Sequence, residues 1–189
     1  MNIFYLDSDP QKAAEMLIDK HVVKMVLESA QLLSTCHRVL DGEHGYKTSA
    51  AGRRLQTWTH PDPKMEEKLY KSQHFNHPCS VWLRESTEHY EWLYKHFKAL
   101  SNEYTKRYNK VHLSWTKLGE ILAIPPWNIE LTPFKEPPQA MPEKYQIENN
   151  SVEAYHNYYQ AEKLSLGTKK DTERYMELSR KIPKDELPF

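Results

Sequence analysis

Glycine is scarce in this chain, and its scarcity argues against several architectures. Only 5 of the 189 residues are glycine. The two glycine-rich patterns that cradle phosphates, G-x-G-x-x-G and G-x-x-x-x-G-K-S/T, are both absent. No stretch alternates between apolar and polar residues for long enough to predict a strand, whereas apolar residues recur at helical spacing nearly everywhere. The sequence therefore predicts an all-α fold without a phosphate-binding loop.

Cysteine is scarcer still, and no metal-ligating spacing is present. Cys36 and Cys79 lie in apolar helical contexts with no signal peptide ahead of them. This predicts reduced core thiols and a cytoplasmic protein. Neither C-x-x-C nor H-x-x-x-H spacing occurs, despite ten histidines. We therefore expect no metal site and no cofactor.

The chain also lacks an excess of one charge and any long apolar run. Lys and Arg together number 26, as do Asp and Glu, so the chain has no overall positive charge of the kind that favours nucleic-acid binding. A local basic patch is compatible with this composition. No apolar run approaches the roughly 20 residues of a membrane span. The length fits one domain, residues 1–189, whose 12% aromatic residues offset a low mean hydropathy of −0.83.

A long amphipathic helix near the start is the strongest feature that the chain does have. Asp9 is a good N-cap and Pro10 fits the first helical position, so we predict one helix over residues 10–40. Its apolar face repeats at three- and four-residue steps: Ala14, Ile18, Val22, Met25, Ser29, Leu32 and Cys36.

Polar residues follow one flank of this apolar face. At about 100° per residue, His21 and Glu28 fall together, with Lys24 a little further round. A glutamate partly buried beside an apolar face should have a raised pKa and can act as a general acid or base. The alternative interpretation is a solvated flank held by ion pairs between successive turns.

The remainder of the chain predicts further helices and one extended segment. Helices are expected over residues 64–73, 78–108, 114–123 and two from 150 to about 180, with Asn76 or His77 capping the second. Six prolines within about residues 125–142 exclude a helix there, and the apolar residues between them predict an extended segment that wraps the bundle.

Two other clusters allow a structural or a functional interpretation. Residues 42–63 are predicted to form an irregular loop, in which Arg53 and Arg54 are either surface residues or contacts for DNA phosphates. Tyr155, Tyr158 and Tyr159 share a helix, either as core packing with one surface ring or as a set of rings that stack on a base.

Three short motifs follow one another along the chain: Asp19, His21 and Glu28 on the first helix, Asn-His-Pro-x-x-x-Trp over residues 76–82, and the tyrosine cluster over residues 155–159. In this order they resemble those of the phage pyrimidine-dimer DNA glycosylases, or endonuclease V-like proteins. If a phage encodes this chain, the expected cytoplasm is that of the host. In these proteins an Asp-x-His is followed, seven residues after the histidine, by the catalytic glutamate. Asp19, His21 and Glu28 match that spacing. Lys20 and Lys24 match the lysines of the same helix in a wider group of related proteins.

The other two motifs are an Asn-His-Pro-x-x-x-Trp over residues 76–82 and the aromatic cluster over residues 155–159. The resemblance implies an all-α fold, DNA as the partner, and Glu28 as the acid/base residue with His21 and Asp19 in support. It also implies substrate contacts from lysines 20 and 24, from Asn76 and His77, and from the tyrosine cluster.

The resemblance further implies an unusual nucleophile, the α-amine of the processed N-terminus, which forms a Schiff base at the sugar C1′. Family members have a small residue after the initiator methionine. Here that residue is Asn2, which predicts that Met1 is retained and would itself supply the amine.

Base excision by cleavage of the N-glycosidic bond is therefore the leading hypothesis for function. A second hypothesis keeps the site but transfers an amine or amino acid to an activated 5-methyl group of thymine in phage DNA. A third is a non-enzymatic, helical accessory protein that binds DNA or protein. None of these hypotheses requires a membrane, and the sequence does not indicate an oligomeric state.

Overall fold

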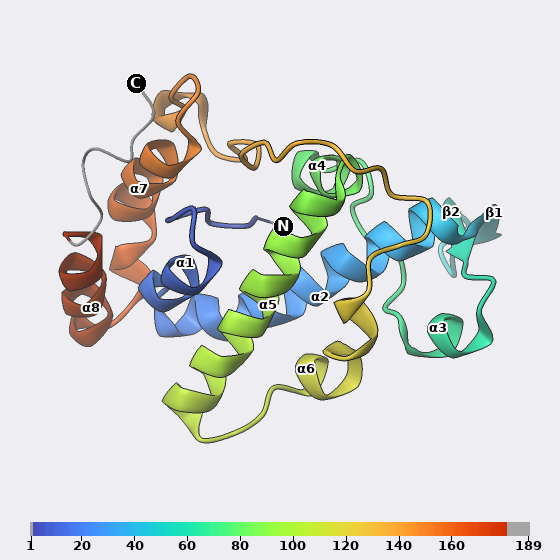
Figure 1. Cartoon of the computed structure of the whole chain (residues 1–189), viewed down its shortest axis with the longest axis horizontal. Helices are drawn as coiled ribbons and strands as arrows, with labels where there is room; N and C mark the ends of the chain where they lie inside the picture. Colours follow the sequence, from blue (N-terminus) through green and yellow to red (C-terminus); the bar gives the residue numbers. More distant parts are fainter. Residues whose placement is uncertain (1, 181–189) are drawn as a thin grey trace.

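The computed structural model describes residues 2–180, and over that range the chain is mostly helical (Figure 1). This confirms the predicted all-α fold class. The α-helices are α1 (Pro10–Met16), α2 (Asp19–Asp41), α3 (Pro63–Lys68), α4 (Pro78–Arg84), α5 (Thr87–Tyr108), α6 (Leu113–Leu118), α7 (Ser151–Glu162) and α8 (Lys169–Ser179). Three short 3-10 helices cover Ile121–Ala123, Glu143–Tyr145 and Leu164–Leu166.

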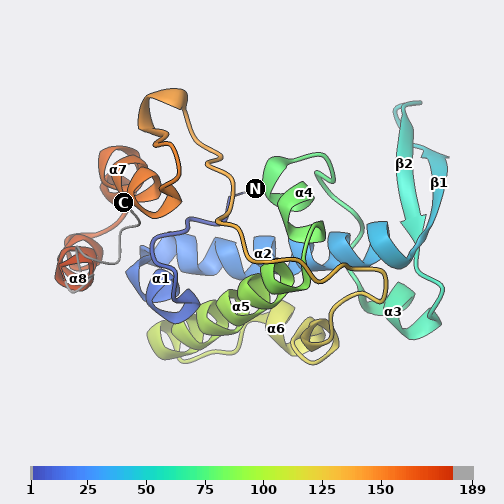
Figure 2. The same ribbon diagram turned by 45° about the horizontal axis from the view of Figure 1, so that its top comes forward.

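Helix α2 is the central element of the fold. Helix α5 packs along α2 and α1, while α4 and α6 pack against α2 from other sides. Helices α7 and α8 lie at the N-terminal end of α2, and a β-hairpin projects from its C-terminal end (Figure 2). The side chains between α2 and α5 form one continuous apolar core. No helix in the described range is long and apolar enough to cross a membrane.

The prediction of one unbroken helix over residues 10–40 is wrong, because the chain turns at Leu17 and Ile18. Leu17 has an extended backbone, with φ −67° and ψ 141°. The side chains of distant helices replace the missing helical hydrogen bonds. The Tyr159 hydroxyl accepts from the Ile18 N–H at 3.0 Å, and Arg107 donates to the Leu17 carbonyl at 2.7 Å. The break therefore depends on tertiary partners, and no local residue signals it.

The second long helix is also interrupted, at Glu85 and Ser86. It begins at Pro78, with His77 as N-cap. His77 is one of the two residues predicted for that position, and its imidazole ring accepts a hydrogen bond from the Cys79 N–H at 3.2 Å. Ser86 then caps the start of α5, and its hydroxyl donates to the Thr132 carbonyl at 2.5 Å. The proline-rich segment thus fixes the break.

The irregular loop predicted for residues 42–63 is instead largely an antiparallel hairpin of β1 (Glu43–Thr48) and β2 (Arg54–Thr59). Its register runs from Glu43 opposite Thr59 to Thr48 opposite Arg54. Most of its side chains are exposed on both faces. A strand with no buried face has no reason to alternate apolar and polar residues, which is why the pattern gave no strand signal.

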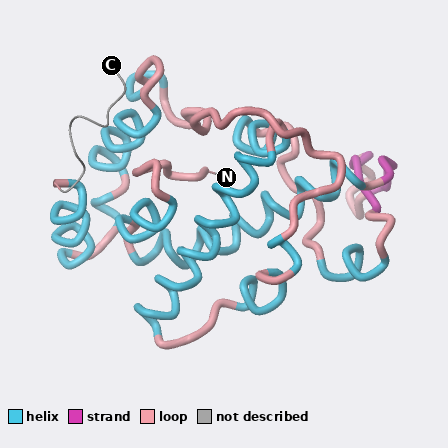
Figure 3. The backbone as a smooth tube through the Cα atoms, viewed as in Figure 1, coloured by secondary structure: helices cyan, strands magenta, loops and turns pink. Residues whose placement is uncertain are grey.

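The proline-rich segment is extended and wraps the helices, as predicted. Figure 3 shows it as a long loop that runs past α4 towards α7. Its carbonyls accept hydrogen bonds from the Trp82 indole, at Lys135, and from the Tyr155 hydroxyl, at Pro138. Beyond it, the Asn150 side chain caps α7 by accepting from the Glu153 N–H at 3.0 Å. This segment therefore links the two ends of the molecule.

Candidate active site

The structure brings the beginning of the chain to Glu28, in the middle of α2. The backbone nitrogen of Asn2 lies 3.4 Å from Oε2 of Glu28. The other carboxylate oxygen pairs with Nζ of Lys24 at 3.3 Å. The Glu28 side chain is 13% exposed and that of Lys24 is 66% exposed. The carboxylate therefore sits at the edge of the interior, between a solvated amine and the N-terminal segment.

Polar and aromatic contacts hold that N-terminal segment in place. The Asn2 amide donates to the Ala140 carbonyl at 2.8 Å, and its oxygen accepts from the Phe4 N–H at 3.0 Å. Phe4 has a left-handed backbone with φ +53°, which is uncommon for a bulky residue. Its buried ring stacks on His21 with centroids 4.7 Å apart. Aromatic packing therefore offsets backbone strain where the chain approaches Glu28.

His21 is part of this packing rather than a solvated base. Its Nδ1 lies 2.7 Å from the Tyr159 hydroxyl, which also accepts from the Ile18 N–H. Burial lowers the pKa of His21 to about 4, and the charges of Lys163 and Lys24 add to that effect. The ring is therefore neutral at pH 7, and it orients Phe4.

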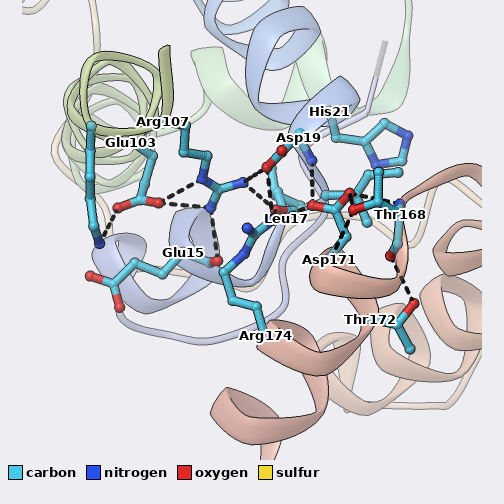
Figure 4. A network of polar contacts seen from close by, with 12 residues as sticks. Glu15, Leu17, Asp19, His21, Glu103, Arg107, Thr168, Asp171, Thr172 and Arg174 are labelled. Carbon is cyan, nitrogen blue, oxygen red and sulfur yellow. Dashed lines mark hydrogen bonds and ion pairs between the residues drawn. The ribbon is translucent and has the colours of Figure 1, made fainter. Parts of the chain in front are cut away.

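Asp19 belongs to a separate ionic network, shown in Figure 4. Its carboxylate accepts from Arg107 of α5 at 3.1 Å and from Arg174 of α8 at 3.0 Å. Its backbone N–H donates to Asp171 at 2.9 Å. Arg107 also pairs with the buried Glu103 at 2.7 Å. These contacts tie the first turn of α2 to α5 and α8, and they give Asp19 a structural role.

The Asn-His-Pro motif approaches the site from α4. His77 is half-buried, and burial lowers its pKa, with the charge of His74 adding to that effect. The charge of Glu28 acts in the opposite direction and raises the pKa of His77. Glu28 therefore lies within electrostatic reach of this imidazole, while Asn76 is exposed beside it. The second motif is therefore related to the first through His77 and Glu28 alone.

The predicted aromatic cluster divides into core and surface residues. Tyr155 and Tyr159 are fully buried, and their hydroxyls bond to the backbone of other segments. Tyr158 is half-buried, with Nζ of Lys163 4.6 Å from its ring centroid. Only Tyr158 among the three therefore presents a ring near the surface.

The predicted basic residues other than Lys24 lie apart from Glu28. Lys20 is exposed in the first turn of α2. Arg53 and Arg54 are exposed on the hairpin, with the Arg54 guanidinium 3.6 Å from the Tyr46 ring centroid. The hairpin begins about 20 Å beyond Glu28 along the helix axis, at about 1.5 Å per residue. Beside it lies a cavity of about 520 Å³, with a lining that includes Lys47, Trp58, Lys71, His74 and Phe75.

Sequence reasoning missed Phe4 and the two arginines of the ionic network. Arg107 and Arg174 lie 88 and 155 residues from Asp19, so no local pattern relates them to it. Phe4 stands in a short apolar stretch that predicts burial only. Its left-handed backbone and its stacking on His21 become visible only in the folded chain.

The mostly helical fold, taken together with a family-model match, places this protein in the class of DNA glycosylases. The chain belongs to the pyrimidine dimer DNA glycosylase family, whose model matches residues 1–117. The match covers the Asp19–Glu28 region and the Asn-His-Pro motif, and it ends before the tyrosine cluster. The match confirms the suspected resemblance, and the family acts on DNA. Searches of curated proteins and of solved structures gave no match.

Proposed function

We propose that this protein excises a pyrimidine base from DNA by cleaving the N-glycosidic bond, with Glu28 as the acid/base residue. The observation that carries this proposal is the 3.4 Å distance between the backbone nitrogen of Asn2 and Oε2 of Glu28. A general base must lie within hydrogen-bonding reach of the proton it takes, and such contacts are often long before substrate binds.

The chemistry proposed for this site uses an amine at the N-terminus. A free α-amine has a pKa of about 7.7–8.0, so part of it is unprotonated and nucleophilic near neutral pH. Its lone pair forms a bond to the sugar C1′, and the base departs with the electrons of the C1′–N bond and takes a proton from water. Glu28 accepts the proton that the attacking amine loses. The C1′–O4′ bond then breaks as the amine lone pair forms the C1′=N bond, and O4′ takes the proton that Glu28 holds, which leaves a protonated Schiff base.

Removal of Met1 would make the Asn2 nitrogen that amine, directly beside Glu28. If Met1 is retained, as the identity of Asn2 predicts, the α-amine belongs to Met1 instead. The mass of the intact protein, together with the mass of the peptide crosslinked to DNA, distinguishes the two cases.

The other predicted residues take supporting roles in this proposal. His21 positions the N-terminal segment through Phe4. Lys24 balances the charge of Glu28 and, with Lys20, faces solvent where a phosphate would approach. His77, the N-cap of α4, interacts electrostatically with the carboxylate, and the exposed Asn76 precedes it in the chain. Tyr158 and the exposed arginines 53 and 54 of the hairpin supply outer contacts for the DNA.

Incubation of the protein with an ultraviolet-irradiated duplex, with and without borohydride, tests the proposal. We expect strand nicking or base release, and a covalent protein–DNA adduct when the Schiff base is reduced. The same duplex without irradiation is the control. Absence of both product and adduct, at protein concentrations that saturate the DNA, would refute excision.

The two alternative hypotheses predict other outcomes, and the first of them requires phage DNA that carries the activated 5-methyl group. Transfer to thymine would leave a heavier nucleoside in digested DNA, with no abasic site. A binding protein would shift the duplex in a gel without any covalent change.

A further inference from the structure

A second cluster of chemically active side chains lies at the far end of α2. His37 and Asp41 stand one helical turn apart on α2, and His60 follows strand β2. Oδ2 of Asp41 is 4.0 Å from Nδ1 of His37 and 3.9 Å from Nε2 of His60. The three ligand atoms all lie within 4.8 Å of one another. These separations are too long for hydrogen bonds.

The two imidazole nitrogens that face Asp41 are buried and unpaired. Within residues 2–180, neither Nδ1 of His37 nor Nε2 of His60 has a hydrogen-bond partner of normal geometry, and each residue is only 3% exposed. The Ile124 carbonyl is only a weak partner of the His37 ring. Buried polar atoms in proteins are almost always satisfied, so two exceptions aimed at one carboxylate call for an explanation. A cation between the three groups would satisfy both nitrogens.

Contacts outside the cluster already orient the His37 ring. Nε2 of His37 lies 2.8 Å from the Tyr90 hydroxyl, which donates its own proton to the Leu122 carbonyl at 2.9 Å. The hydroxyl must therefore accept from Nε2–H, which leaves the lone pair on Nδ1. A ligand histidine held through its other nitrogen is the usual arrangement in metal sites.

The carboxylate is oriented in the same way. Oδ2 of Asp41 accepts from the Trp127 N–H at 2.9 Å, and Oδ1 accepts from the Asn128 N–H at 3.0 Å. A cavity of about 160 Å³ opens beside the three ligands, lined also by Met65, Ile121 and Ile124. It is large enough to hold a water molecule next to a bound ion.

We propose that His37, Asp41 and His60 bind a divalent transition-metal ion of the Zn²⁺ type, with water in a fourth position. Two imidazoles and one carboxylate are the ligands that such ions take in proteins, at about 2.0–2.2 Å. Tetrahedral bonds of that length place ligand atoms about 3.4 Å apart. The two separations from Asp41 would therefore shorten by about 0.5–0.6 Å, and the separation of the two imidazole nitrogens by at most about 1.4 Å.

Binding has one local consequence at His60. In the structure, Nδ1 of His60 accepts from the Asp62 N–H at 3.1 Å, so its ring proton is on Nε2. The ion replaces that proton, the ring carries its proton on Nδ1 instead, and the Asp62 contact opens.

The metal would join three segments that are distant in the sequence. These are the last turn of α2, the exit of the hairpin and the start of the proline-rich segment. The sequence spacing gave no sign of the site, because it contains neither H-x-x-x-H nor C-x-x-C. The one local signal is the His-x-x-x-Asp pair on α2, and such pairs are common on helices without a metal.

Metal binding by the untagged full-length protein tests this inference without DNA. Zn²⁺ and Co²⁺ are titrated into metal-stripped protein, with Co²⁺ followed by its visible absorption. We expect one tightly bound ion per chain and a tetrahedral Co²⁺ spectrum. Loss of a residue that only orients a ligand weakens metal binding by about 10–100-fold. Asp41→Asn and His60→Gln each remove a ligand and should therefore weaken binding by more than that. The control His44→Gln removes an exposed imidazole on β1 and should leave binding unchanged.

A second measurement covers variants that fail to fold. Nitrogen-15 NMR of the histidine rings in the wild-type protein identifies which nitrogens a diamagnetic Zn²⁺ ion shifts. Large shifts at Nδ1 of His37 and Nε2 of His60 support the site. Weak binding, or binding with shifts confined to exposed histidines, would overturn it. Because neither readout involves catalysis, failure of the proposed excision activity would leave this result unaffected.

Discussion

The backbone nitrogen of Asn2 and the carboxylate of Glu28 lie 3.4 Å apart, although different parts of the fold hold each of them. Glu28 is fixed in the continuous helix α2. Asn2 is fixed by the proline-rich segment, through Ala140, and by the stacking of Phe4 on His21. The contact at the proposed active site therefore depends on three parts of the chain that can be perturbed separately.

Glu28→Gln should abolish most of the excision activity while preserving the fold. The substitution keeps the size of the side chain but removes the base, and loss of a general acid or base typically costs about 10²–10⁴-fold in rate. Single-turnover rates on irradiated duplex measure the effect. Glu91→Gln is the control, because Glu91 also pairs with a lysine four residues away, Lys95 on α5, but at the exposed surface. Equal rates for Glu28→Gln and wild type would contradict the assignment.

An uncleaved extension at the N-terminus should prevent borohydride trapping. The extension converts the terminal α-amine into an amide, whose nitrogen lone pair is no longer nucleophilic. The yield of covalent protein–DNA adduct measures the effect, and the same extension at the C-terminus serves as control. DNA binding by gel shift should persist in both proteins. Normal trapping by the N-terminally extended protein would direct attention to a lysine side chain instead.

Much of this fold follows from local sequence signals. The caps at Asp9 and Asn150, the helical periodicity and the cluster of prolines predicted the helices and the wrapping segment. The breaks at Leu17 and Ser86 did not follow, because side chains and backbone far along the chain satisfy the groups exposed there. Local propensity contains no information about those partners.

At the candidate site, too, local sequence signals predicted some contacts and could not predict others. Helical spacing placed Lys24 beside Glu28 correctly. It could not show that the carboxylate of Asp19 is held by arginines of two other helices, or that Tyr155 and Tyr159 support the backbone of other segments. Spacing along one helix gives the direction of a side chain, whereas its partner depends on tertiary packing.

Tyr159→Phe should destabilise the protein, whereas Tyr158→Phe should not. The Tyr159 hydroxyl accepts from the buried Ile18 N–H and bonds to His21. Its removal leaves a buried donor unpaired, at a cost of about 1–3 kcal/mol. Thermal unfolding measures the difference, with Tyr158 as a half-buried control on the same helix. Similar midpoints for both variants would show that water replaces the lost hydroxyl.

Arg53→Ala and Arg54→Ala should weaken DNA binding in a salt-dependent way. Each phosphate contact that is lost should reduce the steepness of log K against log salt by about 1. Fluorescence anisotropy over a range of salt concentrations measures the slope. Lys98→Ala, an exposed cation on α5, is the control. Unchanged slopes for the arginine variants would exclude the hairpin from the DNA interface.

Asp171 should make the folded state sensitive to acid. Burial raises the pKa of this carboxyl, but hydrogen bonds from the N–H groups of Thr168 and Asp19 outweigh it and lower the pKa to about 2. A carboxyl whose pKa is lower in the folded than in the unfolded state stabilises the fold above its unfolded pKa of about 3.9. That contribution is lost as the pH falls from about 4 to about 2. Urea unfolding across this range measures it, and Asp171→Asn should flatten the curve there while lowering stability at pH 7. If the acid limb of Asp171→Asn matches that of the wild type, other carboxyl groups govern acid unfolding.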